Sequence, residues 1–137
     1  MRTVAFSVLA LANTFARASN GGLIVTGSTL AGFHHNLIIT LAARHKLPAV
    51  YPVRLFVANG GLVAYGPDEI DQYRRAAGYV DRILKGEKPA QLPVLQSTKF
   101  EFVLNLQTAR ALNIEVPPGL LAIADEVIEY DAVCCGA

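Results

Sequence analysis

The chain has 137 residues, a formal net charge of +1 at pH 7 and 17% charged residues, which is the size of one domain or of part of a larger protein. The charges are interspersed, so the composition excludes the basic surface that a nucleic-acid-binding protein needs. Because the apolar content of 53% is high for a soluble domain of this length, we expect some apolar surface to face a partner lobe or a second copy.

The two cysteines, Cys134 and Cys135, are neighbours at the C-terminal end of the sequence. No other Cys or His stands near them at ligand spacing, so the sequence excludes a structural zinc site and a disulfide framework. No apolar run reaches the ~18 residues that a membrane-spanning helix requires.

Residues 1–20 fit two interpretations. One positive residue, an apolar run over residues 4–12 and a small-x-small sequence at residues 16–18 are typical of a signal peptide. The same apolar residues also recur at helical spacing up to a stop at residues 19–22. We favour the helix, because residues 13–15, Asn-Thr-Phe, are untypical of the segment before a cleavage site.

The next elements are a strand and a helix. Residues 23–26 form a β-rich run, Leu-Ile-Val-Thr, that Gly27 closes. Either Ser28 or Thr29 suits the N-cap of the helix that follows. Apolar residues at i, i+3 and i+4 predict that this helix runs to about His45.

Two further strands are predicted at residues 48–51 and 62–65, with a short helical turn over residues 53–58 between them. Strands and helices thus alternate along this half of the chain. Such alternation is typical of parallel strands joined by right-handed crossovers.

The helix after residue 65 has the clearest sequence signals of the chain. Pro67 suits its first position, where the missing N–H costs nothing, and Gly86 suits the left-handed position beyond its last turn. Its polar face carries two ion pairs at i, i+4 spacing, which are Asp71 with Arg75 and Asp81 with Lys85.

The remaining chain changes in character. Residues 87–98 contain two prolines and no periodicity, so we predict an extended connector. A strand over residues 99–104 precedes a short helix that Asn105 caps and Asn113 ends. Pro117-Pro118 opens a last helical segment that we expect to reach about residue 128.

Together these elements predict an α/β fold with three layers, in which helices flank a mostly parallel sheet. We expect residues 1–129 to form a single lobe and residues 130–137 to be an irregular tail.

Sequence motifs for catalysis and for metal binding are weak. Ser28 lacks the G-x-S-x-G context of a hydrolase nucleophile, and neither cysteine has a plausible base. His34 and His35 are adjacent and diverge around the helix by ~100°, and His45 has no carboxylate partner at ligand spacing, so we expect surface histidines. We predict no catalytic residue, no metal and no cofactor.

A phosphate-binding loop is also disfavoured. Residues 22–29, Gly-Leu-Ile-Val-Thr-Gly-Ser-Thr, have P-loop glycine spacing but carry Ser28 where the lysine belongs. What remains is the weaker hypothesis that N–H groups at residues 28–30 hold a carboxylate or another small anion at the start of the helix.

The best candidate site is the edge at which the parallel strands end. Thr26, Tyr51 and Tyr65 end the three predicted strands, and such ends converge on one rim where α/β proteins hold small ligands. The alternative is that the tyrosines are half-buried core residues with solvated hydroxyls. The residues that we predict to line the ligand site are Thr26, Ser28, Thr29, Tyr51, Tyr65 and Gly66.

Several segments carry a resemblance to a known family. They are residues 20–25, 42–51, 60–66, 75–86, 92–93, 105–112 and 124–129. In these segments the chain resembles the C-terminal part of the ABC-transporter substrate-binding protein family, which has the type I periplasmic-binding-protein fold and whose better-known members take aromatic amino acids.

The resemblance implies a solute-binding component of an ABC importer. Such a protein closes two lobes on a small organic ligand, such as an amino acid or carboxylate, and passes it to a membrane permease. It further implies that the helix over residues 68–85 packs toward the other lobe, which predicts a homodimer through this helix when that lobe is absent. A periplasmic location is implied as well, and a cytoplasmic one stays open because a clear signal peptide is lacking.

Two other interpretations stay open. The first is a structural or interaction remnant that folds and dimerises but binds no small molecule. The second, a flavodoxin-like enzyme of the cytoplasm, needs a phosphate loop that this sequence lacks.

Overall fold

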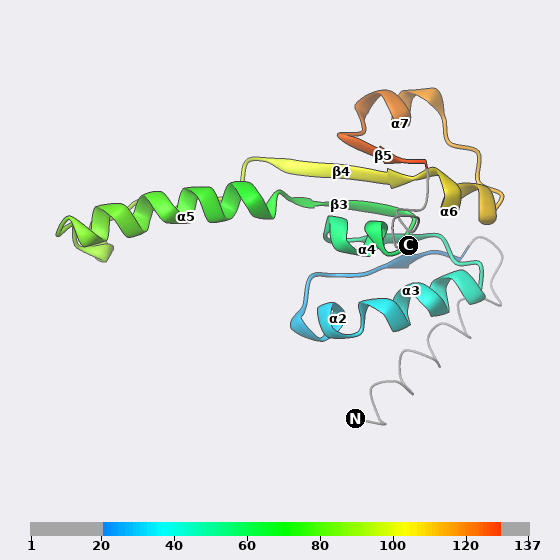
Figure 1. The fold of residues 1–137 in the computed structure, drawn as a ribbon, viewed down its shortest axis with the longest axis horizontal. Coiled ribbons are helices and arrows are strands. Elements are labelled where there is room, and N and C mark those ends of the chain that lie inside the picture. Colours follow the sequence, from blue (N-terminus) through cyan, green and yellow to red (C-terminus); the bar gives the residue numbers. More distant parts are fainter. Residues whose placement is uncertain (1–20, 130–137) are drawn as a thin grey trace, which may run out of the picture.

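A computed structural model of the protein describes residues 21–129. The helix or signal-like segment predicted at residues 1–20 and the tail at residues 130–137 lie outside these residues. Five strands form one sheet in the order β1-β2-β3-β4-β5 (Figure 1). The strands are β1 Leu23–Ile24, β2 Ala49–Tyr51, β3 Val63–Pro67, β4 Phe100–Asn105 and β5 Glu126–Ile128.

The sheet is mostly parallel. The first three strands run parallel, β4 is antiparallel to β3, and β5 is again parallel to β4. The helices that accompany it are α2 Thr29–Phe33, α3 His35–Arg44, α4 Arg54–Ala58, α5 Glu69–Leu84, α6 Leu106–Ala111 and α7 Pro118–Ile123, with a 3₁₀ turn at Pro89–Gln91. The structure thus confirms the predicted α/β class with a mostly parallel sheet and flanking helices.

Local sequence signals set most helix ends. The hydroxyl of Ser28 accepts a hydrogen bond from the Ala31 N–H at 3.2 Å and caps α2, and Asn105 caps α6 in the same way through Thr108. The predicted left-handed stop at Gly86 is present, with φ of 97°. These caps form because the end of a helix leaves backbone N–H or carbonyl groups without a partner. A capping side chain, or a left-handed residue after the last turn, supplies the missing hydrogen bonds.

Two helices differ from the prediction, one because it is divided and one because it starts later. The helix expected from residue 28 to His45 is divided at His34 into α2 and α3, and Gly32, a poor helix former, stands just before the break. Pro67 is not the first residue of α5 but the last residue of β3. Asp68 is the N-cap instead, because its carboxylate accepts a hydrogen bond from the Asp71 N–H at 3.0 Å.

The helix predicted for residues 117–128 is wrong in its second half. Helix α7 ends at Ile123, and the chain continues as strand β5. Asp125 directs this change, because its N–H donates to the Phe102 carbonyl at 2.9 Å and its carboxylate accepts from the Phe102 N–H at 2.8 Å. Pairing with β4 therefore overrides the helical preference of the segment.

The hydrophobic core lies between the sheet and helices α3 and α4. Its buried members are Ile38, Ile39, Ala42, Ala49, Tyr51, Phe56, Val57, Ala64 and Val103. Alternate residues of the strands face this side, as the period of two in a strand requires. None of the helices within residues 21–129 combines the length and hydrophobicity needed to cross a membrane.

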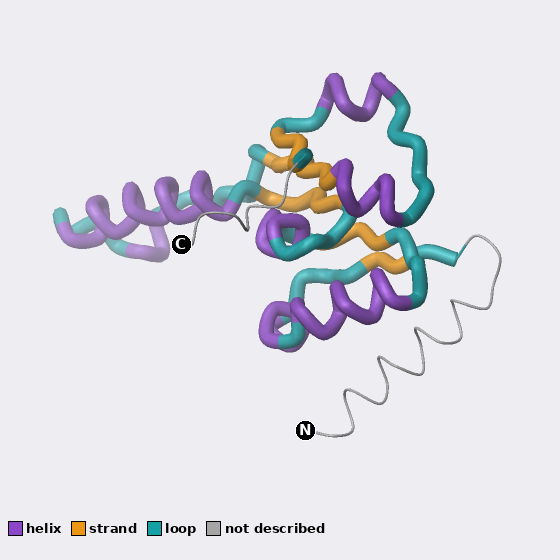
Figure 2. Tube along the Cα trace, turned by 45° about the vertical axis from the view of Figure 1, so that its right-hand side comes forward, coloured by secondary structure: helices purple, strands orange, loops and turns teal. Residues whose placement is uncertain are grey.

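One part of the chain projects away from the sheet. Helix α5 and the segment that returns from it, together residues 68–99, extend beyond the ends of β3 and β4 (Figures 1 and 2), and we call them the arm. The arm leaves at Pro67 and returns at Phe100, which pair across the two strands. At its base the Asp68 N–H donates to the Lys99 carbonyl at 3.0 Å, and Lys99 Nζ lies 2.7 Å from Asp68 Oδ2.

Candidate functional site

The carboxyl ends of β1, β2 and β3 meet at one edge of the sheet. Val25 N–H donates to the Val50 carbonyl at 2.9 Å, and Tyr51 pairs with Ala64. Pro52 lies close to the ends of these strands, because a Cβ added at Gly27 would lie 3.8 Å from the Pro52 side chain and one at Gly66 would lie 1.8 Å from the Pro52 carbonyl oxygen. This edge is the location at which parallel α/β sheets bind ligands.

The six residues that we predicted to line the site differ in their exposure at this edge. Thr26, Ser28 and Thr29 are exposed on the segment between β1 and α2. Tyr65 is 59% exposed and stacks on Phe100, with ring centroids 5.6 Å apart.

Tyr51 belongs to the core rather than to the open rim. Its side chain is 2% exposed and stacks on Phe56 with ring centroids 4.9 Å apart. Burial also raises the pKa of its hydroxyl to about 12. The tyrosine ring is therefore left out of the ligand surface that we propose below, which is a correction to the predicted set.

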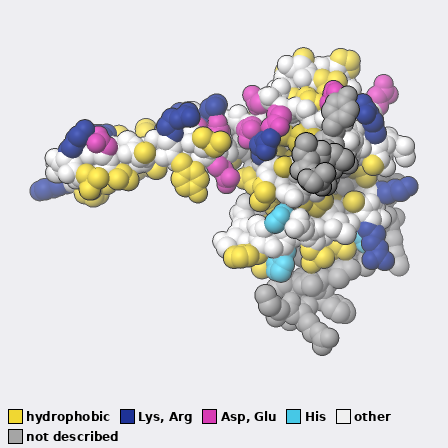
Figure 3. Space-filling view, viewed as in Figure 1, with side chains coloured by type: hydrophobic (Ala, Val, Ile, Leu, Met, Phe, Trp, Pro, Cys, Tyr) yellow, Lys and Arg dark blue, Asp and Glu magenta, His cyan; other side chains and the backbone are white. Residues whose placement is uncertain are grey.

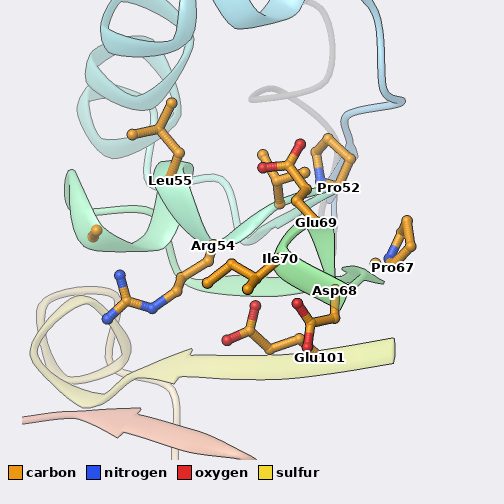
Figure 4. A pocket seen from close by; sticks show the side chains of 11 residues that line it. Pro52, Arg54, Leu55, Pro67, Asp68, Glu69, Ile70 and Glu101 are labelled. Atoms are coloured by element: carbon orange, nitrogen blue, oxygen red, sulfur yellow. The ribbon is translucent and has the colours of Figure 1, made fainter. Parts of the chain in front are cut away.

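A cavity of about 410 Å³ opens where β2 and β3 end and α4 and α5 begin (Figure 4). Its lining combines apolar residues with Arg54 of α4 and with carboxylates at the start of α5 and on β4. The lining residues are Pro52, Val53, Arg54, Leu55, Ala58, Gly66, Pro67, Asp68, Glu69, Ile70 and Glu101. A cavity of this size with a few convergent polar groups suits a small organic molecule.

Two charged residues of the cavity already have partners. Arg54 donates two hydrogen bonds of 2.6 Å to Glu126, and Lys99 donates to Asp68 at 2.7 Å. Each pair lowers the pKa of its carboxyl through the hydrogen bond from the cation. These pairs are neutral overall and leave the other carboxylates of the cavity uncompensated.

Glu101 and Glu69 are the carboxylates of the cavity without such a partner, and Glu101 lies on the strand side of it. Glu101 lies opposite Gly66 in the β3–β4 ladder, and its side chain extends from β4 toward the cavity, beside Asp68 (Figure 4). Within residues 21–129 no side chain donates a hydrogen bond to it or forms an ion pair with it. Desolvation by partial burial raises the pKa of Glu101, and the nearby Asp68 acts in the same direction, while Arg54 opposes both.

Sequence reasoning missed most of this lining. Among the predicted residues, Gly66 lines the cavity, whereas Arg54 and Glu101 come from elements that we did not connect with a site. A strand has a period of two, so Glu101 between Phe100 and Phe102 faces away from both, and this alternation is a signal that could have been used. Only the antiparallel pairing of β4 with β3 places this residue at the strand ends.

The Arg54–Glu126 pair predicts a pH-dependent contribution to stability. Because the pKa of Glu126 is lower in the folded chain than in the unfolded chain, its stabilisation is present above the unfolded pKa and is lost as the pH falls through the folded one. Both side chains are more than a third exposed, so we expect Glu126→Gln to cost at most about 1 kcal/mol at pH 7.

The measurement is urea unfolding of wild type and Glu126→Gln at pH 7 and at a series of lower pH values, over which the difference in the free energy of unfolding should shrink as Glu126 becomes protonated in the folded chain. Glu115→Gln, in the exposed segment after α6, is the matched control. An equal cost at all of these pH values would show that Glu126 acts through packing and not through its charge.

The other kinds of site considered from the sequence were a metal site and an anion site. No three His, Cys, Asp or Glu side chains come together as metal ligands within residues 21–129. Helix α2 has 5 residues, and the Ala31 N–H at its start already donates to Ser28. This bond uses the N–H of Ala31, which lies just beyond residues 28–30, so the anion site considered there stays a prediction.

The fold and the cavity define a class of protein. A mostly parallel α/β sheet whose strand ends open onto a ligand-sized cavity is typical of small-molecule-binding lobes. Comparison with known proteins gives the particular family.

The family described as "ABC transporter substrate binding protein" matches residues 7–128. The chain belongs to this family, as the sequence resemblance implied. Its members are binding proteins rather than enzymes. None of the curated proteins matches the chain.

Solved structures show the same fold. A conserved domain protein from Vibrio cholerae aligns with a TM-score of 0.79 at 22% identity, over 90% of this chain and 41% of that one. The ABC domain in complex with L-Trp from Streptococcus pneumonia aligns with a TM-score of 0.81 at 23% identity, over 93% of this chain and 41% of that one.

The ligand-free, open structure of a substrate binding protein with adhesive properties from Clostridium difficile aligns with a TM-score of 0.62 at 18% identity, over 92% of this chain and 42% of that one. The chain thus spans well under half the length of each of these structures.

Proposed function

We propose that this chain is a ligand-binding lobe of an ABC-importer solute-binding protein, which holds a small organic ligand at the strand ends and serves a membrane permease outside the cytoplasm. The observation that carries the proposal is the cavity between β3, α4 and α5, which opens at the edge where a parallel sheet binds ligands. Family membership supports the same role.

The ligand surface that we propose combines the cavity with the exposed rim beside it. Thr26, Ser28 and Thr29 present hydroxyl groups on the segment after β1, and Tyr65 presents an aromatic face. The backbone of Gly66 forms part of the cavity wall. A second lobe that closes over this surface would supply the remaining contacts.

The charges of the cavity favour a ligand with an amino group. Arg54 and Asp68 are already paired, so the uncompensated carboxylate of Glu101 is available to accept hydrogen bonds from an ammonium group. An amino acid meets this requirement, and a plain carboxylic acid does not. The neighbour from Streptococcus pneumonia is a complex with L-Trp, so we choose tryptophan as the first ligand to test.

A thermal-shift series tests the proposal. L-tryptophan at about ten times Kd stabilises the folded state by about 1.4 kcal/mol and raises Tm by several degrees. We expect indole-3-propionate, which lacks the amino group, to give no shift at the same millimolar concentration. Other amino acids and small carboxylates complete the panel.

A Glu101→Gln variant locates the binding. It keeps the shape of the side chain but removes its charge, so we expect it to lose the tryptophan shift, whereas Glu115→Gln, away from the cavity, keeps it. A shift that survives in Glu101→Gln would place the ligand elsewhere. A flat panel would favour the alternative, a remnant that folds and dimerises without binding a small molecule.

We also propose that the chain forms a homodimer through the helix over residues 68–85. None of the residues of α5 is buried in the single chain. Sedimentation at about 100 μM tests this, and a monomer at that concentration contradicts it.

A further inference from the structure

Glu126 contacts a residue of the cavity without lining the cavity itself. It is the first residue of β5 and is not among the lining residues. Both of its carboxylate oxygens accept hydrogen bonds of 2.6 Å from Arg54, which does line the cavity. A bidentate pair of this kind fixes the orientation of a guanidinium group as well as its position. Glu126 therefore decides where the charge of Arg54 lies.

Strand pairing sets the position of Glu126. It lies opposite Val103 in the parallel β4–β5 ladder. The residue before it, Asp125, is bonded to Phe102 of β4 through both its N–H and its carboxylate, at 2.9 and 2.8 Å. Arg54 is the first residue of the short helix α4, and its long side chain has many rotamers. Glu126 is thus the anchored partner of the pair, and Arg54 is the partner with other positions open to it.

An alternative partner for Arg54 lies in the cavity. The carboxylate of Glu101 is directed to the side on which the Arg54 guanidinium lies (Figure 4). Desolvation raises the pKa of Glu101, and the charge of Arg54 opposes it. The hydrogen bond with Glu126 raises the pKa of Arg54 most, and the charge of Glu101 acts in the same direction. Arg54 and Glu101 therefore attract each other across the cavity, while the hydrogen bonds of Arg54 go to Glu126.

Other acidic groups surround Glu101. Besides desolvation, the charges of Asp68, Glu126 and Asp125 raise its pKa. Acidic side chains gather where α5 meets the rest of the molecule (Figure 3). Arg54 is the only cation among the described residues that line the cavity. If Arg54 turned to Glu101, it would fill the place at which we propose that the ammonium group of the ligand binds.

We propose that Glu126 is a positioning residue for ligand binding, which holds the Arg54 guanidinium away from Glu101 and so keeps the Glu101 carboxylate free for an ammonium group. This inference rests on the proposed function and adds to it a residue outside the cavity. A cation of the same chain competes with the ligand without the entropy cost of association. Holding Arg54 aside therefore gives the cavity its preference for an amino group.

A Glu126→Gln variant of the whole 137-residue chain tests the proposal. Glutamine keeps the size of the side chain but removes the charge that holds Arg54. We expect the Kd of L-tryptophan to rise about tenfold in calorimetric titration, as for the loss of one charge-assisted hydrogen bond. The double variant, Arg54→Gln with Glu126→Gln, also removes the released cation. We expect its Kd to return to near the wild-type value, because the pair that it removes is neutral overall.

Controls separate positioning from folding. Glu129→Gln makes the same substitution at an exposed residue just after β5 and should leave the Kd unchanged. Urea unfolding establishes that each variant is folded. Because the double variant removes two charged groups, a loss of binding caused by damage to the structure would persist or grow in it. A loss caused by the released Arg54 would be reversed.

The titration of Glu101 tests the position of Arg54 without a ligand. The NMR resonance of the Glu101 carboxyl carbon gives the pKa of this group in wild type, in each single variant and in the double variant. A guanidinium group bonded to a carboxylate lowers the carboxyl pKa more than one that is held elsewhere. We therefore expect Arg54→Gln to raise the pKa of Glu101 more in the Glu126→Gln background than in wild type.

A tryptophan Kd that does not rise in Glu126→Gln, or a double variant as weak as Glu126→Gln alone, would overturn the positioning role. Equal effects of Arg54→Gln on the pKa of Glu101 in the two backgrounds would overturn it as well. A wild-type chain that does not respond to tryptophan or to the rest of the panel would instead contradict the proposed function. The Glu101 titration would then still decide whether Glu126 holds Arg54 away.

Discussion

The Gly66→Ala substitution is expected to lower the free energy of unfolding by about 3 kcal/mol or more, because the added methyl group meets backbone. A Cβ at Gly66 would lie 1.8 Å from the Pro52 carbonyl oxygen and 2.9 Å from its carbon. No side-chain rotation relieves such an overlap, so β2 and β3 must move apart at their ends. The same movement deforms the cavity, since Pro52 and Gly66 both line it.

Gly32→Ala is the matched control for this prediction. A Cβ at Gly32 has no atom within 4 Å, and the residue lies inside α2, where alanine is favoured over glycine by up to about 1 kcal/mol. Urea unfolding should therefore find Gly66→Ala strongly destabilised and Gly32→Ala unchanged or slightly stabilised. Equal stabilities for the two variants would mean that the strand ends adapt without cost.

The Phe56→Ala substitution is expected to lower the free energy of unfolding by about 3–5 kcal/mol, the range observed when a large aromatic residue is removed from a core. Phe56 is 2% exposed and stacks on Tyr51. It also meets the ring of His35 edge to face, at 6.1 Å between centroids. Its loss therefore leaves a cavity at the junction of α3, α4 and β2.

Phe33→Ala is the matched control, because it makes the same substitution at an exposed position. Phe33 is 81% exposed at the end of α2, so its removal should change the free energy of unfolding by less than about 0.5 kcal/mol. Chemical unfolding followed by far-UV circular dichroism measures both variants. A small cost for Phe56→Ala would show that the core collapses into the space.

Features that depend on neighbouring residues were predictable from the sequence. Ser28 and Asn105 cap their helices as expected, and Gly86 and Asn113 take the left-handed conformations expected at helix ends. The two predicted ion pairs of α5 are present, with Asp71 and Arg75 2.7 Å apart and Asp81 and Lys85 2.8 Å apart. Each of these depends on contacts within about one helical turn.

Features that depend on distant segments were not predictable in this way. Residues 124–128 continue the helical pattern in the sequence, but Asp125 bonds Phe102 and the segment becomes β5. Tyr51 ends a strand at the predicted rim, but it is buried in one core cluster with residues of α3 and with Val103 of β4. In both cases a partner outside the local segment decides the outcome.

The sequence by itself determined the α/β class, the parallel direction of the first three strands, the arm helix and the family, because periodicity, caps and family segments are all local. Tertiary structure alone decided which side chains surround the cavity. Glu101 reaches it only because β4 pairs antiparallel with β3, and Arg54 is neutralised only because β5 brings Glu126 to it. A charge acts over a few ångströms in space, and those distances follow from strand pairing rather than from separation along the chain.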